Sequence, residues 1–434
     1  MDSSAPSDGK PHVVIVGGGF GGLEVARTLR NAPVRITVID KSNHHLFQPL
    51  LYQVATAGLS PADIAAPIRN VLRRQRDVDV IMAEVTGIDK ASRQVVMGAR
   101  SLSYDFLIVA TGARDAYFGH DEWELHAPGL KTIPQATDIR RKILLAFEQA
   151  EAAEDNSQRQ SLLTFVLVGG GPTGVEMAGA IAELSHKALA SDFRHIDPRM
   201  SRIILIEAGP RILSTFHESL SRKSRRMLER LGVDVREGQK VEAIDTEGVI
   251  VAGARIESRN VIWAAGVRAS PAAQWLGAEA DGSGRVKVLD DCRLPNFPEI
   301  FVIGDTMTME QDGKLLPGVA PVAIQQGHYV GQQIIRRVEG EPGPMGPFLY
   351  FDKGNLATVG RAFAVLEFHK IRMSGALAWL AWLAVHIFFL IGFRNRAVVL
   401  IQWAWAYLTY QRGARLITMP TDGPDIKDPE AEKS

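Results

Sequence analysis

The sequence predicts an α/β fold made of two doubly wound domains, the second inserted in the first, followed by an apolar helical C-terminal region. Three observations predict it. A pattern of strand, glycine-rich turn and helix occurs twice, at His12–Leu29 and Thr164–Ile181. Each copy is followed by another apolar strand that ends in an acidic residue. Two further apolar strands, Tyr104–Ala113 and Pro298–Asp305, lie on opposite sides of the second copy, so we expect the first domain to resume after the second ends.

The first glycine-rich turn has a dinucleotide-binding pattern. It reads GxGxxG through Gly17, Gly19 and Gly22. In such a turn the first glycine allows a tight bend, the second lets the backbone approach a pyrophosphate, and the third lets the helix pack closely on its strand. The N-terminus of that helix then faces the anion. The next strand, Arg35–Asp40, ends in a carboxylate about where an adenosine ribose would lie.

The second turn repeats this arrangement through Gly169, Gly171 and Gly174, and its following strand ends in Glu207. The alternative for both turns is an ordinary doubly wound fold whose glycines bind nothing. Against it, the strand, turn, helix, second strand and acid come in the order that a dinucleotide site requires. Two such sites in one chain indicate two dinucleotides with electrons passing between them.

These segments give the expected domain boundaries. The first dinucleotide-binding domain is expected at residues 11–136 and 277–340, and the second at residues 161–276. Residues 1–10 and 421–434 are polar and are expected to be disordered.

The composition excludes several classes of function. Lysine plus arginine and aspartate plus glutamate both total 49, so no basic field exists that would attract nucleic acid. Cys292 is the only cysteine, which excludes a disulfide scaffold and an internal dithiol redox pair. The eleven histidines are scattered, and we expect no metal site.

Residues 345–418 are expected to associate with a membrane. Two runs without formal charge, Ala376–Phe393 and Ala397–Gln411, contain four of the seven tryptophans. As a helix, the first run would span about 27 Å, close to the roughly 30 Å thickness of a hydrocarbon core. A single crossing is possible, but we favour two short helices lying in one leaflet, with Arg394 and Arg396 at the headgroups. A buried core helix or a dimer interface is the remaining alternative.

Taken together, these features resemble those of the two-dinucleotide-binding flavoproteins. Over residues 11–418 the chain looks most like a type II, non-proton-pumping NADH:quinone oxidoreductase. The stretches that carry the resemblance are Tyr117–Thr132, Gly169–Glu176, Ala320–Gly327 and His386–Arg396.

The resemblance implies which dinucleotide each domain binds. FAD would lie non-covalently in the first domain, and NADH would bind the second as a substrate. A carboxylate at Glu207 disfavours the 2′-phosphate of NADPH, although Arg211 nearby leaves NADPH open. The residues implied for FAD are Gly17, Gly19, Gly22, Asp40, Lys41, Thr111, Gly112, Gly304 and Asp305, and those implied for NADH are Gly169, Gly171, Gly174, Glu207 and Gly266.

The resemblance also implies a quinone site at Ala320, Pro321, Gln325 and Lys370. The family usually has AQxxxQ in this segment, with both glutamines beside the quinone. Here Pro321 replaces the first glutamine, and Gln325 retains the second. Gln325 could instead be an ordinary helix-surface residue, and Lys370 an interfacial anchor.

Glu176 is the candidate proton carrier. Its position in the motif places it, by the resemblance, near the nicotinamide and the flavin, and a partly desolvated glutamate there could relay protons. The matching Glu24 in the first motif makes a purely structural role the alternative. His386 is the only titratable group in the first apolar run, and one histidine makes no proton pathway, so we expect no proton pumping.

The implied function is transfer of a hydride from NADH to FAD, and then of two electrons to a membrane quinone of a respiratory chain. We expect contact with the lipid bilayer through residues 376–411 at the cytoplasmic face of the inner membrane, since the N-terminus carries no secretory signal. A homodimer is a further possibility. Sulfur-dependent relatives are excluded by the lone cysteine. Electron transfer to a protein acceptor, or an NADH-responsive binding role, stays open.

Overall fold

The computed structural model describes residues 9–341, 343, 346–391, 393–409 and 412–418. The expected disordered tail at 421–434, and all but the last two residues of the expected disordered N-terminus, lie outside these residues. The chain divides into two units. The first unit consists of the described residues of Met1–Leu46, Ala65–Arg114 and Val267–Lys353, and the second of those of Phe47–Ile64, Asp115–Gly266 and Gly354–Ser434.

The first unit is built on a six-stranded sheet with the order β20-β21-β9-β1-β2-β5. Its central strand β1 (His12–Val16) is buried at every residue and pairs in parallel with neighbours on both sides, as expected for a sheet covered on both faces. β21 pairs in parallel with β9 although nearly 200 residues separate them in sequence. The sheet strands are β2 (Arg35–Asp40), β5 (Val78–Met82), β9 (Phe106–Val109), β20 (Arg293–Leu294) and β21 (Phe297–Val302).

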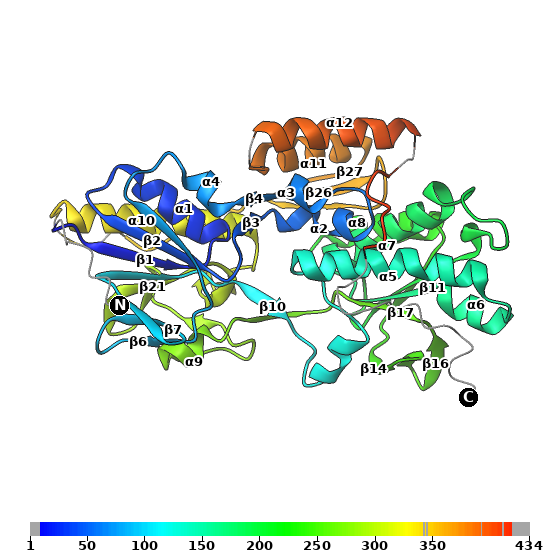
Figure 1. Ribbon diagram of the computed structural model, residues 1–434, viewed down its shortest axis with the longest axis horizontal. Helices are drawn as coiled ribbons and strands as arrows, with labels where there is room; N and C mark the ends of the chain where they lie inside the picture. Colours follow the sequence, from blue (N-terminus) through cyan, green and yellow to red (C-terminus); the bar gives the residue numbers. More distant parts are fainter. Residues whose placement is uncertain (1–8, 342, 344–345, 392, 410–411, 419–434) are drawn as a thin grey trace. The chain divides into compact units, whose positions relative to one another are not determined.

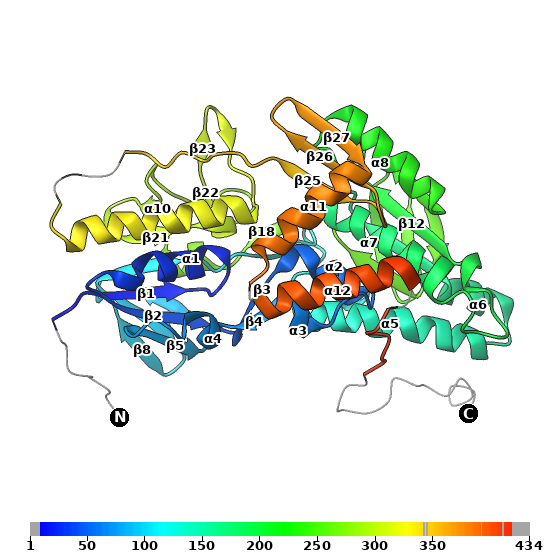
Figure 2. The same cartoon turned by 90° about the horizontal axis from the view of Figure 1, so that it is seen from above.

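Helices pack on this sheet, and α1 begins at its glycine turn. α1 and α10 contact one another and lie side by side (Figure 2). The helices of this unit are α1 (Phe20–Thr28), α4 (Ile68–Leu72), α9 (Ala272–Leu276) and α10 (Ala320–Val338). Its smaller strands are β3 (His44–Leu46), β4 (Ala65–Pro67), β6 (Gly87–Asp89), β7 (Gln94–Met97), β8 (Arg100–Ser103), β19 (Val286–Lys287), β22 (Met307–Thr308), β23 (Glu310–Gln311) and β24 (Lys314–Leu315).

The second unit repeats the parallel arrangement in a four-stranded sheet with the order β13-β12-β11-β17. β11 (Thr164–Val168) is buried throughout and pairs in parallel with both β12 and β17. The other strands of the sheet are β12 (Arg202–Glu207), β13 (Val233–Glu237) and β17 (Asn260–Trp263), and a separate antiparallel sheet contains β14 (Val241–Asp245), β15 (Gly248–Val251) and β16 (Ala254–Glu257). The helices before the C-terminal region are α2 (Leu51–Ala55), α3 (Pro61–Ile64), α5 (Ile133–Ala152), α6 (Asn156–Leu162), α7 (Pro172–Glu183) and α8 (Glu218–Arg230).

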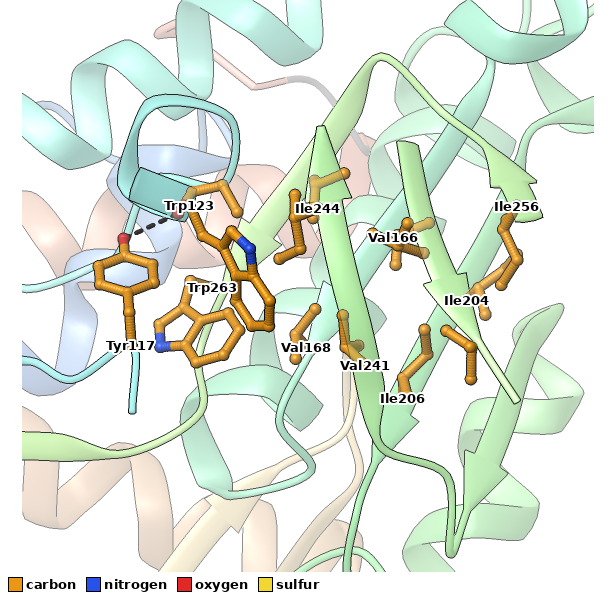
Figure 3. Packing of buried hydrophobic residues seen from close by; sticks show 14 residues of the cluster. Tyr117, Trp123, Val166, Val168, Ile204, Ile206, Val241, Ile244, Ile256 and Trp263 are labelled. Atoms are coloured by element: carbon orange, nitrogen blue, oxygen red, sulfur yellow. Dashed lines mark hydrogen bonds between the residues drawn. The ribbon is translucent and has the colours of Figure 1, made fainter. Parts of the chain in front are cut away.

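Aromatic residues fill one end of the core of this unit (Figure 3). The rings of Tyr117 and Trp263 lie 5.0 Å apart, and Trp123 packs beside Trp263 at 5.8 Å. The polar groups of Tyr117 and Trp263 both form hydrogen bonds. Tyr117 Oη donates to Ala127 O at 2.8 Å, and Trp263 Nε1 donates to Ala116 O at 3.0 Å. Tyr117, Trp123 and Ala127 therefore close one end of the core of the second unit.

The C-terminal region belongs to the second unit. An antiparallel sheet of β25 (Asn355–Thr358), β26 (Ala364–Phe368) and β27 (Ile371–Gly375) precedes α11 (Ala376–Phe389) and α12 (Phe393–Thr409), and α11 contacts both this sheet and α12 (Figure 1). Arg396 donates to the carbonyl oxygens of Phe388 and Leu390 at 2.7 and 2.8 Å, which satisfies carbonyls at the end of α11. Within the described residues, no helix combines the length and the apolar character needed to cross a membrane.

The structure confirms the α/β fold class. Each of the two main sheets contains parallel strands, and a glycine turn follows its central strand. The compact units divide between Arg114 and Asp115 and between Gly266 and Val267. The expected domain bounds at residues 136 and 277 stay predictions. The second unit also includes Phe47–Ile64, which sequence reasoning assigned to the first domain.

Candidate functional site

The first glycine turn has the geometry of a phosphate cradle. Gly17 has a φ of +109°, and its amide donates to Ile39 O at 2.8 Å, which joins the turn to β2. A Cβ atom on Gly22 would lie 1.9 Å from Gly17 O, so only glycine lets α1 start this close to its strand. Gly19 is the N-cap of α1, and open space lies beside it. The helix N-terminus can therefore receive a pyrophosphate, as FAD requires.

Asp40 holds this turn in place. Its Oδ2 accepts from Gly18 N and its Oδ1 accepts from Ser42 N, both at 2.7 Å. Lys41 follows at the end of β2 with an exposed side chain. The carboxylate therefore lies beside the glycine turn, and its remaining lone pairs are available to accept hydrogen bonds from the ribose hydroxyls of a dinucleotide.

Two further strand ends meet at the same edge of this sheet, because β9 and β21 are neighbours. Thr306 Oγ1 accepts from Gly112 N at 2.8 Å, which links Gly112 to the segment containing Gly304 and Asp305. Thr111 Oγ1 lies 2.5 Å from Ser270 Oγ. The predicted residues Thr111, Gly112, Gly304 and Asp305 are thus brought together, while sequence reasoning missed Thr306.

The second turn reproduces the first almost atom for atom. Gly169 has a φ of +110° and donates to Ile206 O at 2.8 Å, and a Cβ on Gly174 would lie 1.9 Å from Gly169 O. Glu207 accepts from Gly170 N through Oε2 and from Gly209 N through Oε1, both at 2.6 Å. Gly171 is the N-cap of α7 and has open space beside it. This turn fits the pyrophosphate of a second dinucleotide.

Gly266, expected at the second dinucleotide, and Arg211, which left NADPH open, both lie in loops. Gly266 follows β17 with a φ of +79°, and a Cβ there would meet the ring of Phe118 at 2.3 Å. Arg211 donates to Ser214 O and Phe216 O at 2.8 and 2.6 Å, so its guanidinium is engaged with the backbone of its own loop.

Glu176 lies on α7 and faces a cavity of 120 Å³ in the second unit. Its Oε1 accepts from Thr358 N at 3.3 Å. Burial raises the pKa of Glu176 to about 8, and the hydrogen bond from Thr358 offsets only part of this effect. The side chains around the cavity are mainly aromatic and polar, and include Tyr52, Gln53, Thr56, Glu183, Thr358, Arg361, Trp379, Trp382, Trp403 and Arg412.

Hydrogen bonds connect the apolar helix α12 with Thr358, the residue that donates to Glu176. Trp403 Nε1 donates to Gln53 Oε1 at 2.7 Å, and Gln53 Nε2 donates to Tyr52 Oη at 3.0 Å. Tyr52 Oη lies 3.2 Å from Thr358 Oγ1, and Thr358 N donates to Glu176. Because the indole nitrogen can only donate, it fixes which way the Gln53 amide points. The carboxyl of Glu176 therefore lies next to a row of hydrogen-bonded polar side chains, those of Gln53, Tyr52 and Thr358.

The residues expected at the quinone lie on α10 and at the turn between β26 and β27. Pro321 lies in the first turn of α10, where its missing N–H has no intrahelical partner to lose. Gln325 donates to Phe351 O and accepts from Phe351 N, both at 2.9 Å. Ala320 begins α10, and Lys370 lies exposed at the turn between β26 and β27. Lys370 is not among the residues that line the cavity at Glu176.

Cys292 is fully buried, and burial raises the pKa of its thiol. A buried thiol with a raised pKa is a poor nucleophile. Among the described residues, no group of three or more histidine, cysteine, aspartate or glutamate side chains could hold a metal ion.

Sequence reasoning missed most of the cavity around Glu176. Tyr52, Thr358 and Arg412 come from segments far apart in the chain, and none lies in a recognisable motif. Glu183 had a signal, since it is seven residues after Glu176 and so falls on the same face of the expected helix.

Comparisons with known proteins agree with this arrangement. Residues 11–327 match the family described as pyridine nucleotide-disulphide oxidoreductase. The chain is 44% identical over 432 residues to type II NADH:quinone oxidoreductase Ndh of Mycobacterium tuberculosis, covering 96% of this chain and 92% of that protein. It is 43% identical over 436 residues to NdhA of the same organism, with the same two coverages.

Solved structures show the same fold. NDH2 of Plasmodium falciparum in complex with NADH superposes with a TM-score of 0.85 at 20% identity, covering 94% of this chain and 100% of that one. The sulfide:quinone oxidoreductase of Aquifex aeolicus gives a TM-score of 0.71 at 19% identity, covering 89% and 92%. The chain thus belongs to the pyridine nucleotide-disulphide oxidoreductase family and, within it, to the type II NADH:quinone oxidoreductases.

Proposed function

We propose that this enzyme oxidises NADH, uses bound FAD as its redox cofactor and reduces a membrane quinone without pumping protons. The close relatives named type II NADH:quinone oxidoreductase carry this proposal. The two glycine turns, each with a carboxylate bound to its backbone, support two dinucleotides. FAD, when bound, supplies the two-electron redox chemistry.

FAD is assigned to the first unit. Its pyrophosphate would lie over the turn of Gly17, Gly19 and Gly22, and its ribose at Asp40. The strand ends at Thr111 and Gly112 and at Gly304 and Asp305, with Lys41 at the rim, would hold the rest. The open space at Gly19 supports this assignment, because the backbone amides there are accessible to an anion.

NADH is assigned to the second unit, over Gly169, Gly171 and Gly174, with its ribose at Glu207 and Gly266 nearby. A carboxylate at this position repels a 2′-phosphate. The only basic alternative that the sequence suggested, Arg211, points its guanidinium at carbonyl groups of its own loop. We therefore expect NADH to be preferred over NADPH.

The quinone contact is proposed at the start of α10. Gln325 uses one N–H for Phe351, and its amide has a second N–H that could bind a quinone carbonyl oxygen. Ala320 and Pro321 would line the approach without providing a side-chain donor. Lys370, exposed at its hairpin turn, fits an interfacial anchor better than a headgroup contact.

The lipid bilayer is proposed to contact α11 and α12. Large apolar side chains on these helices are exposed, including Leu377 at 68%, Ile401 at 69% and Trp405 at 59%. Such a surface favours helices lying in one leaflet of the membrane. The inner membrane and its cytoplasmic face are the expected location, and a homodimer stays a prediction.

Glu176 is proposed to supply a proton for quinol formation. NADH, one proton and quinone give NAD⁺ and quinol, so each turnover takes one proton from water. A carboxyl with a pKa of about 8 is protonated at neutral pH and can still release its proton.

The proposed function is tested by steady-state turnover of the FAD-loaded enzyme in detergent. NADH oxidation should be rapid with a short-tail quinone, and the kcat/KM for NADH should exceed that for NADPH. Oxidation of NADH that a quinone does not accelerate would point instead to a protein acceptor or a sensing role.

A further inference from the structure

Helix α7 carries a second glutamate that faces the same cavity as Glu176. Seven residues separate Glu176 from Glu183, a rotation of about 700°, so the two side chains share one helix face about 10 Å apart along the axis. Both line the 120 Å³ cavity. Tyr52 lies in the wall of this cavity, and burial together with the negative charges of both carboxylates raises its pKa. The two acids thus belong to one polar compartment.

The contacts of Glu183 leave one carboxyl oxygen able to exchange a proton. Its Oε1 accepts from Arg361 N at 2.5 Å. Its Oε2 lies 3.7 Å from Arg412 Nη2, which is longer than a hydrogen bond. Arg412 instead donates to Thr56 O at 2.5 Å and to Ala180 O at 3.1 Å. In the part of the chain that the structure describes, Oε2 of Glu183 accepts no hydrogen bond.

The pKa of Glu183 is raised overall, because burial outweighs the effect of two nearby arginines. Burial raises its pKa, while Arg412 and Arg361 lower it. Tyr52 and Glu176 are the other titratable groups that face it across the cavity. A carboxyl with opposing influences of this kind can both take up and release a proton.

We propose that Glu183 supplies protons to Glu176: it takes a proton from water and returns it to the Glu176 carboxylate after each turnover. The inference rests on the proposed function, in which one proton per quinol comes from water. Glu183 releases this proton to a water in the cavity. The proton then passes from one cavity water to the next and is taken up by the Glu176 carboxylate. No electrons move. A water needs about 10–15 Å³, so the cavity has room for several.

The test compares the first turnover with later turnovers in Glu183→Gln, Glu176→Gln and wild-type enzyme, each loaded with FAD. In Glu183→Gln the proton already on Glu176 should support a first turnover within about twofold of wild type. Steady-state turnover should then fall about tenfold or more, and most above the pKa of Glu176, about 8. A small weak acid in the buffer should restore it. In Glu176→Gln the first turnover itself should be slow.

Arg415→Gln is the matched control. Arg415 lies in the same segment as Arg412 and pairs with Asp192 rather than with a cavity residue. This variant should keep wild-type turnover. A defect seen only in Glu183→Gln is then due to loss of the Glu183 carboxyl and not to loosening of the segment that contains Arg412 and Arg415.

Two results with Glu183→Gln would overturn the inference. Glu183→Gln could turn over like wild type, or its first turnover could fall as much as its steady state, which would indicate a structural role. In either case quinone reduction by wild type leaves the proposed function standing, whereas failure of the wild type to reduce quinone would remove both the proposed function and the inference.

If Glu183→Gln does not retain FAD, infrared difference spectra of wild type and Glu176→Gln decide. A carboxyl protonation change that persists in Glu176→Gln supports the inference, and its loss overturns it.

Discussion

Asp40 and Glu207 each use both carboxylate oxygens to bind the backbone of a glycine turn. A carboxylate can accept four hydrogen bonds, so two sites stay free for a ribose. The same side chain therefore shapes the turn and offers the ribose contact. An amide at either position would replace one acceptor oxygen with a donor that faces a backbone N–H.

Glu207→Gln should raise the KM for NADH by about 10- to 100-fold with FAD content unchanged, because loss of a hydrogen bond to a charged group costs about 1.5–3 kcal/mol. It should also narrow the preference for NADH over NADPH, since the repelling charge is gone. Asp40→Asn is the matched variant and should lower FAD content instead. Initial rates and flavin absorbance measure both effects. Equal FAD loss in the two variants would contradict the assignment of the two turns.

Glu176→Gln should lower quinone reduction by about 10² or more, the usual contribution of a positioned proton donor. The sign of the pH dependence follows from the raised pKa. The carboxyl is protonated below about pH 8 and loses its proton above it, so wild-type quinone reduction should fall as pH rises through this value. The variant should lack that fall. A rate and pH profile unchanged from wild type would remove Glu176 from the mechanism.

At the scale of elements, each glycine turn works because a helix begins directly against its strand. A Cβ 1.9 Å from a carbonyl oxygen cannot be relieved by a side-chain rotation, since the position of a Cβ is fixed by its own backbone and the oxygen is a backbone atom. The helix N-terminus and the strand end would have to separate.

Gly174→Ala should abolish flavin reduction by NADH while FAD stays bound, because only the second turn is disturbed. Gly22→Ala should prevent FAD binding. Gly282→Ala is the control, because a Cβ there meets nothing within 4 Å. Flavin absorbance before and after NADH distinguishes the three. Normal reduction of Gly174→Ala by NADH would show that the second turn does not hold NADH.

The helices α11 and α12 expose apolar side chains on one side and supply cavity tryptophans on the other. Replacing both Leu377 and Ile401 by glutamate should release the enzyme from liposomes, because their side chains are 68% and 69% exposed and would be charged at the lipid surface. Leu125→Glu changes a leucine outside these helices that is 78% exposed, and it should leave binding intact. Co-sedimentation measures both. Retention of the double variant on liposomes would contradict the proposed membrane surface.

For the whole molecule, the sequence was sufficient to predict the two parallel sheets and their order of insertion, because strand, turn and acid are local signals. Asp40 and Glu207 lie at the turns where their positions placed them. The cavity at Glu176 could not be predicted in this way. Tyr52 and Arg412 reach it only because Phe47–Ile64 and the C-terminal segment fold into the second unit, and no local pattern encodes that packing.

The central claim is that electrons pass from NADH through FAD to a quinone. Anaerobic stopped-flow of the detergent-purified enzyme tests it most directly, with NADH added first, a short-tail quinone second, and flavin absorbance followed throughout. The account predicts bleaching by NADH and then rapid reoxidation by the quinone. Bleaching without reoxidation would contradict the account and leave an NADH-reducible flavoprotein with a different electron acceptor.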